Sequence, residues 1–126
     1  MNKMILFVDD QELLARLSCD ILRSHGYGAE PAYNGREALE KIKQQKFDIL
    51  VTDFRMVGMN GLELARLVRL ELPGLPVLIV SGYPPSEGSG EVNGWIQKEA
   101  GLFPALLNTI KQYIGEPNPP EILQTA

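Results

Sequence analysis

The feature that most constrains the fold is an alternation of short, uninterrupted apolar runs with longer stretches that are apolar only at every third or fourth residue. Short runs of this kind are typical of strands buried on both faces of a parallel sheet, and the periodic stretches are typical of helices that cover such a sheet. The alternation therefore predicts an α/β fold. The five expected strands are Met4 to Val8, Ala29 to Tyr33, Phe47 to Thr52, Val77 to Val80 and Trp95 to Gln97.

Three helices are expected between the first four strands. The stretch Gln11 to Ser24 is apolar at helical spacing and is followed by Gly26, a residue type that favours the left-handed conformation after a helix. Asn34 and Asn60 each precede a glutamate by three residues, which is the spacing of a capping pair at the start of a helix. The expected core-facing residues of the first helix are Leu14, Leu17, Ile21 and Leu22.

The regular alternation breaks between Gly82 and Gly94. This stretch is rich in proline and glycine and has no apolar periodicity, so we expect a loop with at most one turn of helix. A last amphipathic helix is expected to begin near Pro104. The proline-rich stretch that follows predicts a domain over residues 1–115 and an extended or disordered tail over residues 116–126.

Length and composition exclude several classes of protein. A chain of 126 residues suits one domain, and its net charge of −4 argues against nonspecific binding of nucleic acid or anionic lipid. One cysteine and one histidine cannot form an internal disulfide or a Cys/His zinc site. Because no apolar run is long enough for a signal peptide or a membrane span, a reducing cytoplasm is the expected location.

Polar residues follow the expected strands at the place where α/β proteins bind ligands, which is the carboxyl end of the parallel sheet. Asp9 and Asp10 follow the first strand and Asp53 follows the third. A right-handed connection places these two strands side by side, so the three carboxylates are expected to share one pocket. Ser81 and Lys98 follow the fourth and fifth strands.

Three carboxylates in one pocket require compensating positive charge. Two unit charges at about 4 Å repel by about 1 kcal/mol in water and by about 4 kcal/mol at an effective dielectric near 20. Carboxylates and water are suited to Mg²⁺, which usually completes its coordination with phosphate oxygens. An aspartate in such a site can attack phosphorus and form an acyl phosphate. The sequence therefore predicts phosphoryl chemistry.

Four stretches of the chain resemble the response regulator receiver domain of two-component signalling, in the family's order and at expected strand ends. They are Val8-Asp9-Asp10, Asp48 to Met56 leading to Gly61, Val80-Ser81-Gly82 and Trp95-Ile96-Gln97-Lys98. The resemblance covers Lys3 to about Ile114 and implies a flavodoxin-like, doubly wound parallel five-stranded sheet of strand order 2-1-3-4-5. The fourth helix of that fold is expected to be short or missing here. A stand-alone receiver and a part of a hybrid histidine kinase both remain open.

The resemblance also implies how the acidic residues act. Asp53 would accept a phosphoryl group from a phosphohistidine donor. Mg²⁺ would be held by Asp9, Asp10, Asp53 and the backbone carbonyl of Arg55. The chain would not be an enzyme beyond this self-catalysed transfer and the later hydrolysis of its own phosphoryl group.

Further roles follow from the resemblance for residues around the acids. Ser81 and Lys98 would each contact a phosphoryl oxygen only in the phosphorylated state, so these contacts would shift the conformational equilibrium. Trp95 is the aromatic residue expected to move inward together with Ser81. Arg55 and Tyr83 flank the path of the attacking water and are expected to slow hydrolysis.

The chain departs from the family at three places. Glu99 follows Lys98 where proline is usual, which leaves the position of the lysine less firmly defined. Val57 also stands where proline is common. The stretch from Gly82 to Gly94 replaces the helix that normally forms part of the output and dimer face, so we expect this protein to signal through another face or through a mobile loop.

The expected partners are a histidine kinase or a histidine phosphotransfer protein and an unidentified downstream protein, without direct nucleic-acid or membrane contact. A weak homodimer is left open. One alternative is a pseudo-receiver, an interaction module that works without phosphorylation. A less favoured alternative is a Mg²⁺-dependent phosphatase, since such enzymes generally carry a second acid where this chain has Arg55. A flavin or nucleotide site is disfavoured because Asp10-Gln11-Glu12 stands where a glycine-rich phosphate loop is expected.

Overall fold

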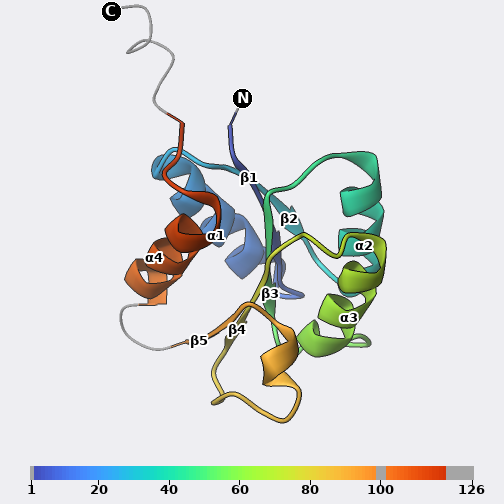
Figure 1. The fold of residues 1–126 in the computed structure, drawn as a ribbon. Coiled ribbons are helices and arrows are strands. Elements are labelled where there is room, and N and C mark those ends of the chain that lie inside the picture. Colours follow the sequence, from blue (N-terminus) through green and yellow to red (C-terminus); the bar gives the residue numbers. More distant parts are fainter. Residues whose placement is uncertain (1, 99–101, 119–126) are drawn as a thin grey trace, which may run out of the picture.

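The computed structural model describes residues 2–98 and 102–118 and contains one five-stranded parallel sheet (Figure 1). The strand order is β2-β1-β3-β4-β5, so the predicted order 2-1-3-4-5 is confirmed. Each expected strand is present within two residues of its predicted bounds. The strands are β1 (Met4–Val8), β2 (Gly28–Ala32), β3 (Ile49–Asp53), β4 (Val77–Ser81) and β5 (Gly94–Gln97).

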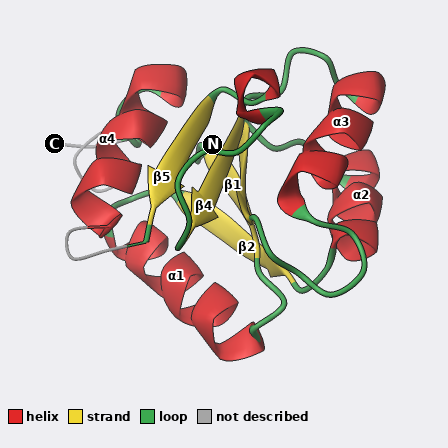
Figure 2. Cartoon of the chain, turned by 90° about the horizontal axis from the view of Figure 1, so that it is seen from below, coloured by secondary structure: helices red, strands yellow, loops and turns green. Residues whose placement is uncertain are grey.

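Helices cover both faces of the sheet, as Figure 2 shows. The helices are α1 (Glu12–Ser24), α2 (Gly35–Gln44), α3 (Gly61–Glu71) and α4 (Leu102–Ile114). Helices α1 and α4 lie on one face, where Leu22 and Ile110 pack with Ile5 in one buried cluster. Helices α2 and α3 lie on the other face, where Leu64 packs with Leu6. Successive residues of β1 thus point into two different cores, which explains why its sequence is apolar without alternation.

Two helices begin at the asparagines that the sequence indicated. The Asn60 side chain accepts a hydrogen bond from the Glu63 amide at 2.9 Å, and the Glu63 carboxylate accepts one from the Asn60 amide at 3.2 Å, which completes a capping box. The Asn34 side chain caps α2 by accepting from the Glu37 amide at 2.8 Å. A cap of this kind stabilises a helix by about 1 kcal/mol. The Asn60 cap also defines the end of the loop between β3 and α3.

The prediction of the core-facing side of α1 was wrong for Leu14 and Leu17 and right for Leu22. Leu14 and Leu17 are 43 % and 48 % exposed, whereas Ala15 and Cys19 are fully buried together with Leu22. Both sets of residues recur at helical spacing, so the period alone could not separate them. The small side chains of Ala15 and Cys19 allow the helix to approach the sheet closely, and the larger leucines are left on the solvent side. Burial raises the pKa of the Cys19 thiol to about 11, so this thiol is protonated at neutral pH.

The connection between β4 and β5, here called the β4–β5 segment (residues 82–93), contains only the short 3₁₀ turn η1 (Ser89–Glu91). The prediction of a short or missing fourth helix is therefore confirmed. The Glu91 carboxylate accepts a hydrogen bond from Arg66 on α3 at 2.6 Å, and the Glu91 carbonyl accepts one from Arg69. Further along, Asn93 exchanges two hydrogen bonds of 2.9 Å with Val77. A few side-chain contacts and one backbone hydrogen bond thus attach this segment to the domain.

The chain beyond α4 returns toward the amino-terminal edge of the sheet. The Tyr27 hydroxyl donates to the Gly115 carbonyl at 2.9 Å, and Lys111 lies 3.6 Å from Glu116. Pro117 lies against Gly26, which has the left-handed φ of 97° that its place after α1 requires. The remainder of the predicted tail, residues 119–126, lies outside the described residues. No helix in the described part of the chain has the length and apolar character needed to cross a bilayer.

Candidate functional site

The three predicted acids meet at the carboxyl end of β1 and β3. One carboxylate oxygen from each of Asp9, Asp10 and Asp53 lies within 4.8 Å of the others. Asp9 and Asp53 are buried, and Asp10 is half-buried at the rim. Strands β1 and β3 pair directly, with Val8 opposite Thr52, so the residues that follow them leave the sheet side by side. Parallel pairing of two strands far apart in sequence therefore creates the acid cluster.

Backbone amides hold each acid of the cluster. The Asp9 carboxylate accepts from the Gln11 amide at 3.0 Å, and that of Asp53 accepts from the Phe54 amide at 3.0 Å. These two donors lie within two residues of their acceptors. The Asp10 carboxylate accepts from the amide of Val57 at 2.9 Å, which belongs to the loop between β3 and α3. The orientation of Asp10 thus depends on a distant part of the chain.

Lys98 provides the positive charge that the cluster requires. Its Nζ lies 3.0 Å from Asp53 Oδ1 and 3.9 Å from Asp9 Oδ2. The Lys98 amide donates to the Ser81 carbonyl at 2.7 Å, so pairing of β5 with β4 brings the lysine to the site. The predicted convergence of Lys98 on the acids is therefore present. Glu99, where the family usually has proline, lies outside the described residues.

The cluster raises the proton affinity of its most buried member. Desolvation by burial raises the pKa of the Asp9 carboxyl above its ordinary 3.8, and the nearby charges of Asp53 and Asp10 act in the same direction. The Gln11 amide and the Lys98 ammonium oppose this effect but do not cancel it. A bound cation would stabilise the charged form of such a carboxylate.

The donors in this site fit Mg²⁺. All three side chains offer carboxylate oxygens, and the half-buried position of Asp10 leaves the cluster open to water on one side. Mg²⁺ prefers one or a few carboxylates together with water or phosphate oxygens. Arg55, whose carbonyl was predicted as a further ligand, lies on the loop that begins directly after Asp53. Among the described residues, only these three acids form such a group.

Ser81 lies at the end of β4, next to β3. Its side chain is buried, and Val80, the residue before it, is paired with Asp53. The Ser81 hydroxyl accepts a hydrogen bond from the Tyr83 amide at 3.0 Å. Ser81 is thus on the strand adjacent to that of Asp53 and is linked to the first residues of the β4–β5 segment.

The rim of the site is formed by aromatic and guanidinium side chains. The Arg55 guanidinium lies 4.1 Å from the centroid of the half-exposed Tyr83 ring. The Trp95 indole donates to the Tyr83 carbonyl at 2.9 Å, and its ring lies 5.1 Å from that of Phe54. Sequence reasoning assigned roles to Arg55, Tyr83 and Trp95 but missed Phe54. The position of an aromatic residue directly after Asp53 was the available signal.

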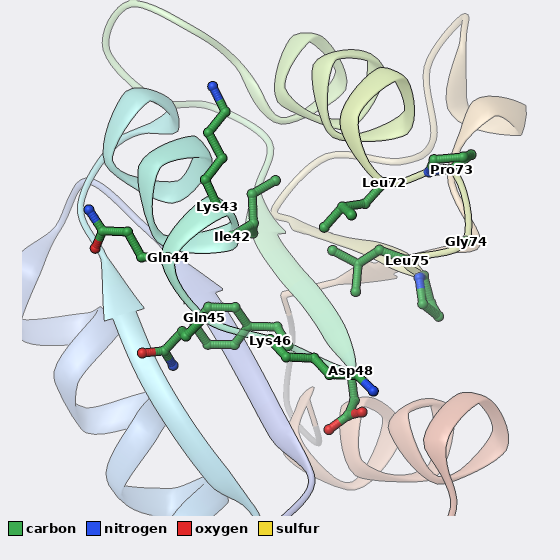
Figure 3. A pocket seen from close by; sticks show the side chains of 12 residues that line it. Ile42, Lys43, Gln44, Gln45, Lys46, Asp48, Leu72, Pro73, Gly74 and Leu75 are labelled. Carbon is green, nitrogen blue, oxygen red and sulfur yellow. The ribbon is translucent and has the colours of Figure 1, made fainter.

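A hollow of about 710 Å³ lies at the opposite edge of the sheet, as Figure 3 shows. It opens between the end of α2 and the end of α3, with Ile42 and Leu72 on its two sides. Its one acidic side chain, Asp48, accepts a hydrogen bond from the Met4 amide at 2.7 Å. Lys43 and Lys46 also line this hollow, which is separate from the acid cluster.

Comparisons with known proteins place this site in a family context. The family described as response regulator receiver domain matches residues 5–92. The chain is 36% identical over 105 residues to the chemotaxis protein CheY-3 of Vibrio cholerae, covering 77% of this chain and 81% of that protein. It is 36% identical over 87 residues to the transcriptional regulatory protein ZraR of Escherichia coli, covering 69% of this chain but only 20% of ZraR.

The structural comparison agrees. The response regulator TrrA of Thermotoga maritima, crystallised with Mg²⁺ and BeF, superposes with a TM-score of 0.82 at 28% identity, covering 89% of this chain and 99% of TrrA. TrrA has also been solved in complex with the histidine kinase ThkA, and the likeness to that chain has the same TM-score. The fold is therefore the CheY-like flavodoxin fold that was predicted.

Proposed function

Since the chain belongs to the response regulator receiver domain family, we propose that it is a phosphorylation-dependent signalling switch that accepts a phosphoryl group from a phosphohistidine donor onto Asp53. The observation that supports this proposal best is the ion pair of 3.0 Å between Lys98 and Asp53 within the three-carboxylate cluster. Three carboxylates and an ammonium group lie within one pocket, so one carboxylate can act as nucleophile while the others hold a cation. These are the components that phosphoryl transfer to a carboxylate requires.

In the proposed transfer, one carboxylate oxygen of Asp53 attacks phosphorus in line with the donor nitrogen. The P–N bond to the donor imidazole breaks as the new P–O bond forms, and the imidazole leaves with the electron pair of the broken bond. Lys98 Nζ is close enough to Asp53 to stabilise the negative charge on the transferred group. Mg²⁺, held by Asp9, Asp10, Asp53 and the Arg55 carbonyl, would neutralise further charge on the phosphoryl oxygens.

The chain carries out no reaction on a separate substrate in this proposal. Hydrolysis of the acyl phosphate by water breaks the same P–O bond, releases inorganic phosphate and restores the Asp53 carboxylate. Tyr83 and Arg55, stacked at the rim, restrict the approach of that water. The lifetime of the phosphorylated state is then set by this chain's own side chains.

The switch would begin at Ser81. When its hydroxyl turns to a phosphoryl oxygen, it ceases to accept the hydrogen bond from the Tyr83 amide that it accepts here. Trp95 follows, because its indole is bonded to the Tyr83 carbonyl. Contacts made only in the phosphorylated state are what shift the population of the two conformations. The output therefore starts in the β4–β5 segment.

A phosphohistidine donor protein would dock on α1. Leu13, Leu14 and Leu17 are large exposed apolar side chains on this helix, and α1 begins two residues after Asp10. Apolar side chains beside the acceptor site supply contact area that excludes water during transfer. The complex of TrrA with a histidine kinase supports a partner of this class. For the downstream partner we propose a protein rather than nucleic acid, in keeping with the net charge of −4.

Intact-mass spectrometry tests the proposal. The chain is incubated with a small-molecule phosphodonor and Mg²⁺, and one added phosphoryl group is expected. The Asp53→Asn variant is the matched control, because asparagine keeps the shape and the acceptor oxygen that bonds the Phe54 amide but is not a nucleophile. Absence of phosphorylation in the wild type, or an equal gain of mass in Asp53→Asn, would contradict the proposal.

The β4–β5 segment favours a second candidate, an interaction module of the same fold that works without phosphorylation. The segment holds only the η1 turn in place of the helix that receivers use for output. The phosphorylation experiment separates the two candidates. The phosphatase alternative is not supported further, because Arg55 stands where a second acid would be needed and stacks on Tyr83.

A further inference from the structure

The three acids of the cluster are not supported equally. Asp9 and Asp53 each bond to a nearby amide of their own strand end, and both contact Lys98. Asp10 forms no ion pair with any residue in the described part of the chain. Its carboxylate accepts a hydrogen bond from the amide of Val57, 47 positions away. One amide on another loop therefore orients the third carboxylate.

The loop that carries this amide is closed at its base. The Gly61 amide donates to the Phe54 carbonyl at 2.8 Å, and a Cβ on Gly61 would lie 2.5 Å from the Asp53 carbonyl oxygen. The Asn60 capping box holds the far end of the loop on α3. Gly58, which follows Val57, has a φ of 82°, a conformation that favours glycine. The closed base of the loop, the Asn60 cap and the conformation of Gly58 therefore fix the direction of the backbone at Val57.

The side chain of Val57 does not explain the position of this residue. It is 85 % exposed, so it contributes little to the packing of the domain. Its backbone N–H is the group that reaches the site. Proline at this position would have no N–H and could not make this contact.

We propose that Val57 is a positioning residue whose backbone N–H holds the Asp10 carboxylate in the metal-binding cluster before the cation arrives. Without this bond, repulsion from Asp9 and Asp53 turns the half-buried Asp10 side chain toward solvent. Cation binding must then bring it back, which weakens the affinity. The inference rests on the proposed function only in taking Mg²⁺ as the cation of this cluster.

Two variants isolate the N–H from the side chain. Val57→Pro removes the N–H, whereas Val57→Ala keeps it and removes most of the exposed side chain. The Mg²⁺ dissociation constant is measured from the chemical shifts of the Gln11 and Phe54 amides, which bond to Asp9 and Asp53 and remain in every variant. We expect Val57→Pro to weaken Mg²⁺ binding by about threefold to tenfold, as loss of one hydrogen bond implies, and Val57→Ala to leave it unchanged.

The same comparison in an Asp10→Ala background shows whether the effect passes through Asp10. There, Val57→Pro and Val57→Ala should bind Mg²⁺ equally, because no carboxylate remains to be positioned. An undiminished loss in this background would show that proline acts by distorting the loop, and it would overturn the proposal. Equal or tighter binding by Val57→Pro in the otherwise unchanged chain would also overturn it.

A measurement without metal keeps this inference separate from the proposed function. The Val57 amide shift should move strongly in Asp10→Ala and only slightly in Asp9→Ala, whether or not the chain is phosphorylated. If the wild type failed to bind Mg²⁺, both proposals would fail. If the wild type bound Mg²⁺ and became phosphorylated while Val57→Pro matched Val57→Ala, only the role of Val57 would be rejected.

Discussion

At the carboxyl end of the sheet, the half formed by β1 and β3 and the half formed by β4 are built in different ways. At the ends of β1 and β3, the buried carboxylates of Asp9 and Asp53 are held by backbone amides within two residues of them. At the end of β4, Ser81 is buried, but the β4–β5 segment after it is attached through exposed side chains such as Glu91. Strands β1 and β3 themselves pair through their backbones in the buried centre of the sheet, and such contacts open only with the whole fold, whereas exposed side-chain contacts open locally.

This difference assigns chemistry and movement to different halves. Changes in the acid cluster should alter the rate of phosphoryl transfer and the stability of the domain. Changes in the β4–β5 segment should leave the transfer intact and alter the lifetime of the phosphoryl group or local motion.

The largest effect is expected at Lys98, which joins the two halves. Lys98→Ala should slow phosphorylation of Asp53 by about 100-fold, because it removes the ammonium group next to the acceptor. The rate is followed by intact-mass spectrometry with a small-molecule phosphodonor. Lys111→Ala is a suitable control, since it removes a lysine whose ion pair with Glu116 is exposed. A rate within about threefold of the wild type would show that Lys98 does not stabilise the transferred group.

A smaller effect is expected at Tyr83, the first aromatic residue of the β4–β5 segment. Tyr83→Ala should shorten the lifetime of the phosphoryl group severalfold without changing its rate of formation, because it removes the ring on which Arg55 stacks. The lifetime is measured by loss of the added mass after removal of the phosphodonor. Tyr83→Phe keeps the ring and should behave as the wild type. An unchanged or longer lifetime in Tyr83→Ala would exclude this role.

Without bound metal, the acid cluster should lower the free energy of unfolding of the domain at neutral pH. Asp9→Asn should raise the free energy of unfolding by about 1 kcal/mol, a few degrees in Tm, because it removes a buried charge and keeps the oxygen that bonds the Gln11 amide. Thermal unfolding without Mg²⁺ measures the change. Asp20→Asn, at an exposed position, should remain within about 0.5 kcal/mol of the wild type.

The difference in stability between Asp9→Asn and the wild type should depend on pH with a definite sign. Burial raises the pKa of Asp9 in the folded protein above its ordinary 3.8, so the native state binds this proton more tightly than the unfolded chain does. The contribution of Asp9 to stability is therefore greatest below the unfolded value and is lost as pH rises through the raised native value. The advantage of Asp9→Asn should shrink as the pH is lowered toward 4. An advantage that grew at low pH would contradict this explanation.

The smallest effect on stability is expected in the β4–β5 segment. Glu91→Ala should lower the free energy of unfolding by less than about 1 kcal/mol, because the ion pair with Arg66 is exposed. The same change should increase hydrogen exchange across residues 86–92, while β1 and β3 keep their protection. Glu71→Ala, which removes a comparable exposed pair with Lys43, should leave that exchange unchanged. Strong protection across residues 85–92 in the wild type would count against a mobile output segment.

Most of the fold followed from patterns within single segments. The apolar runs located the strands, and Asn34 and Asn60 marked where helices begin, because a capping side chain acts on an amide only three residues away. The core-facing side of α1 followed only in part, at Leu22. Its alternative apolar stripes have the same period, and only packing against the sheet selects the one with smaller side chains.

The site shows the same division. Strand ends and residue types in sequence were enough to predict that Asp9, Asp10, Asp53 and Lys98 would converge, because the direction of parallel strands brings their carboxyl ends to one edge. The hydrogen bond from Val57 to Asp10 and the tilted ring contact of Phe54 with Trp95 were not predictable in this way. A backbone N–H is the same for nearly every residue type, so its partner is decided by how the loops close.

The sequence by itself therefore determined which chemical groups meet at the edge of the sheet. The tertiary structure decided which backbone amides and side chains contact each carboxylate, and through which contacts the β4–β5 segment is attached. The physical reason is that residue type, and the tendency of a segment to form a strand or a helix, are local properties of the sequence. The orientation of a carboxylate and the attachment of a loop depend on contacts between residues far apart in the chain.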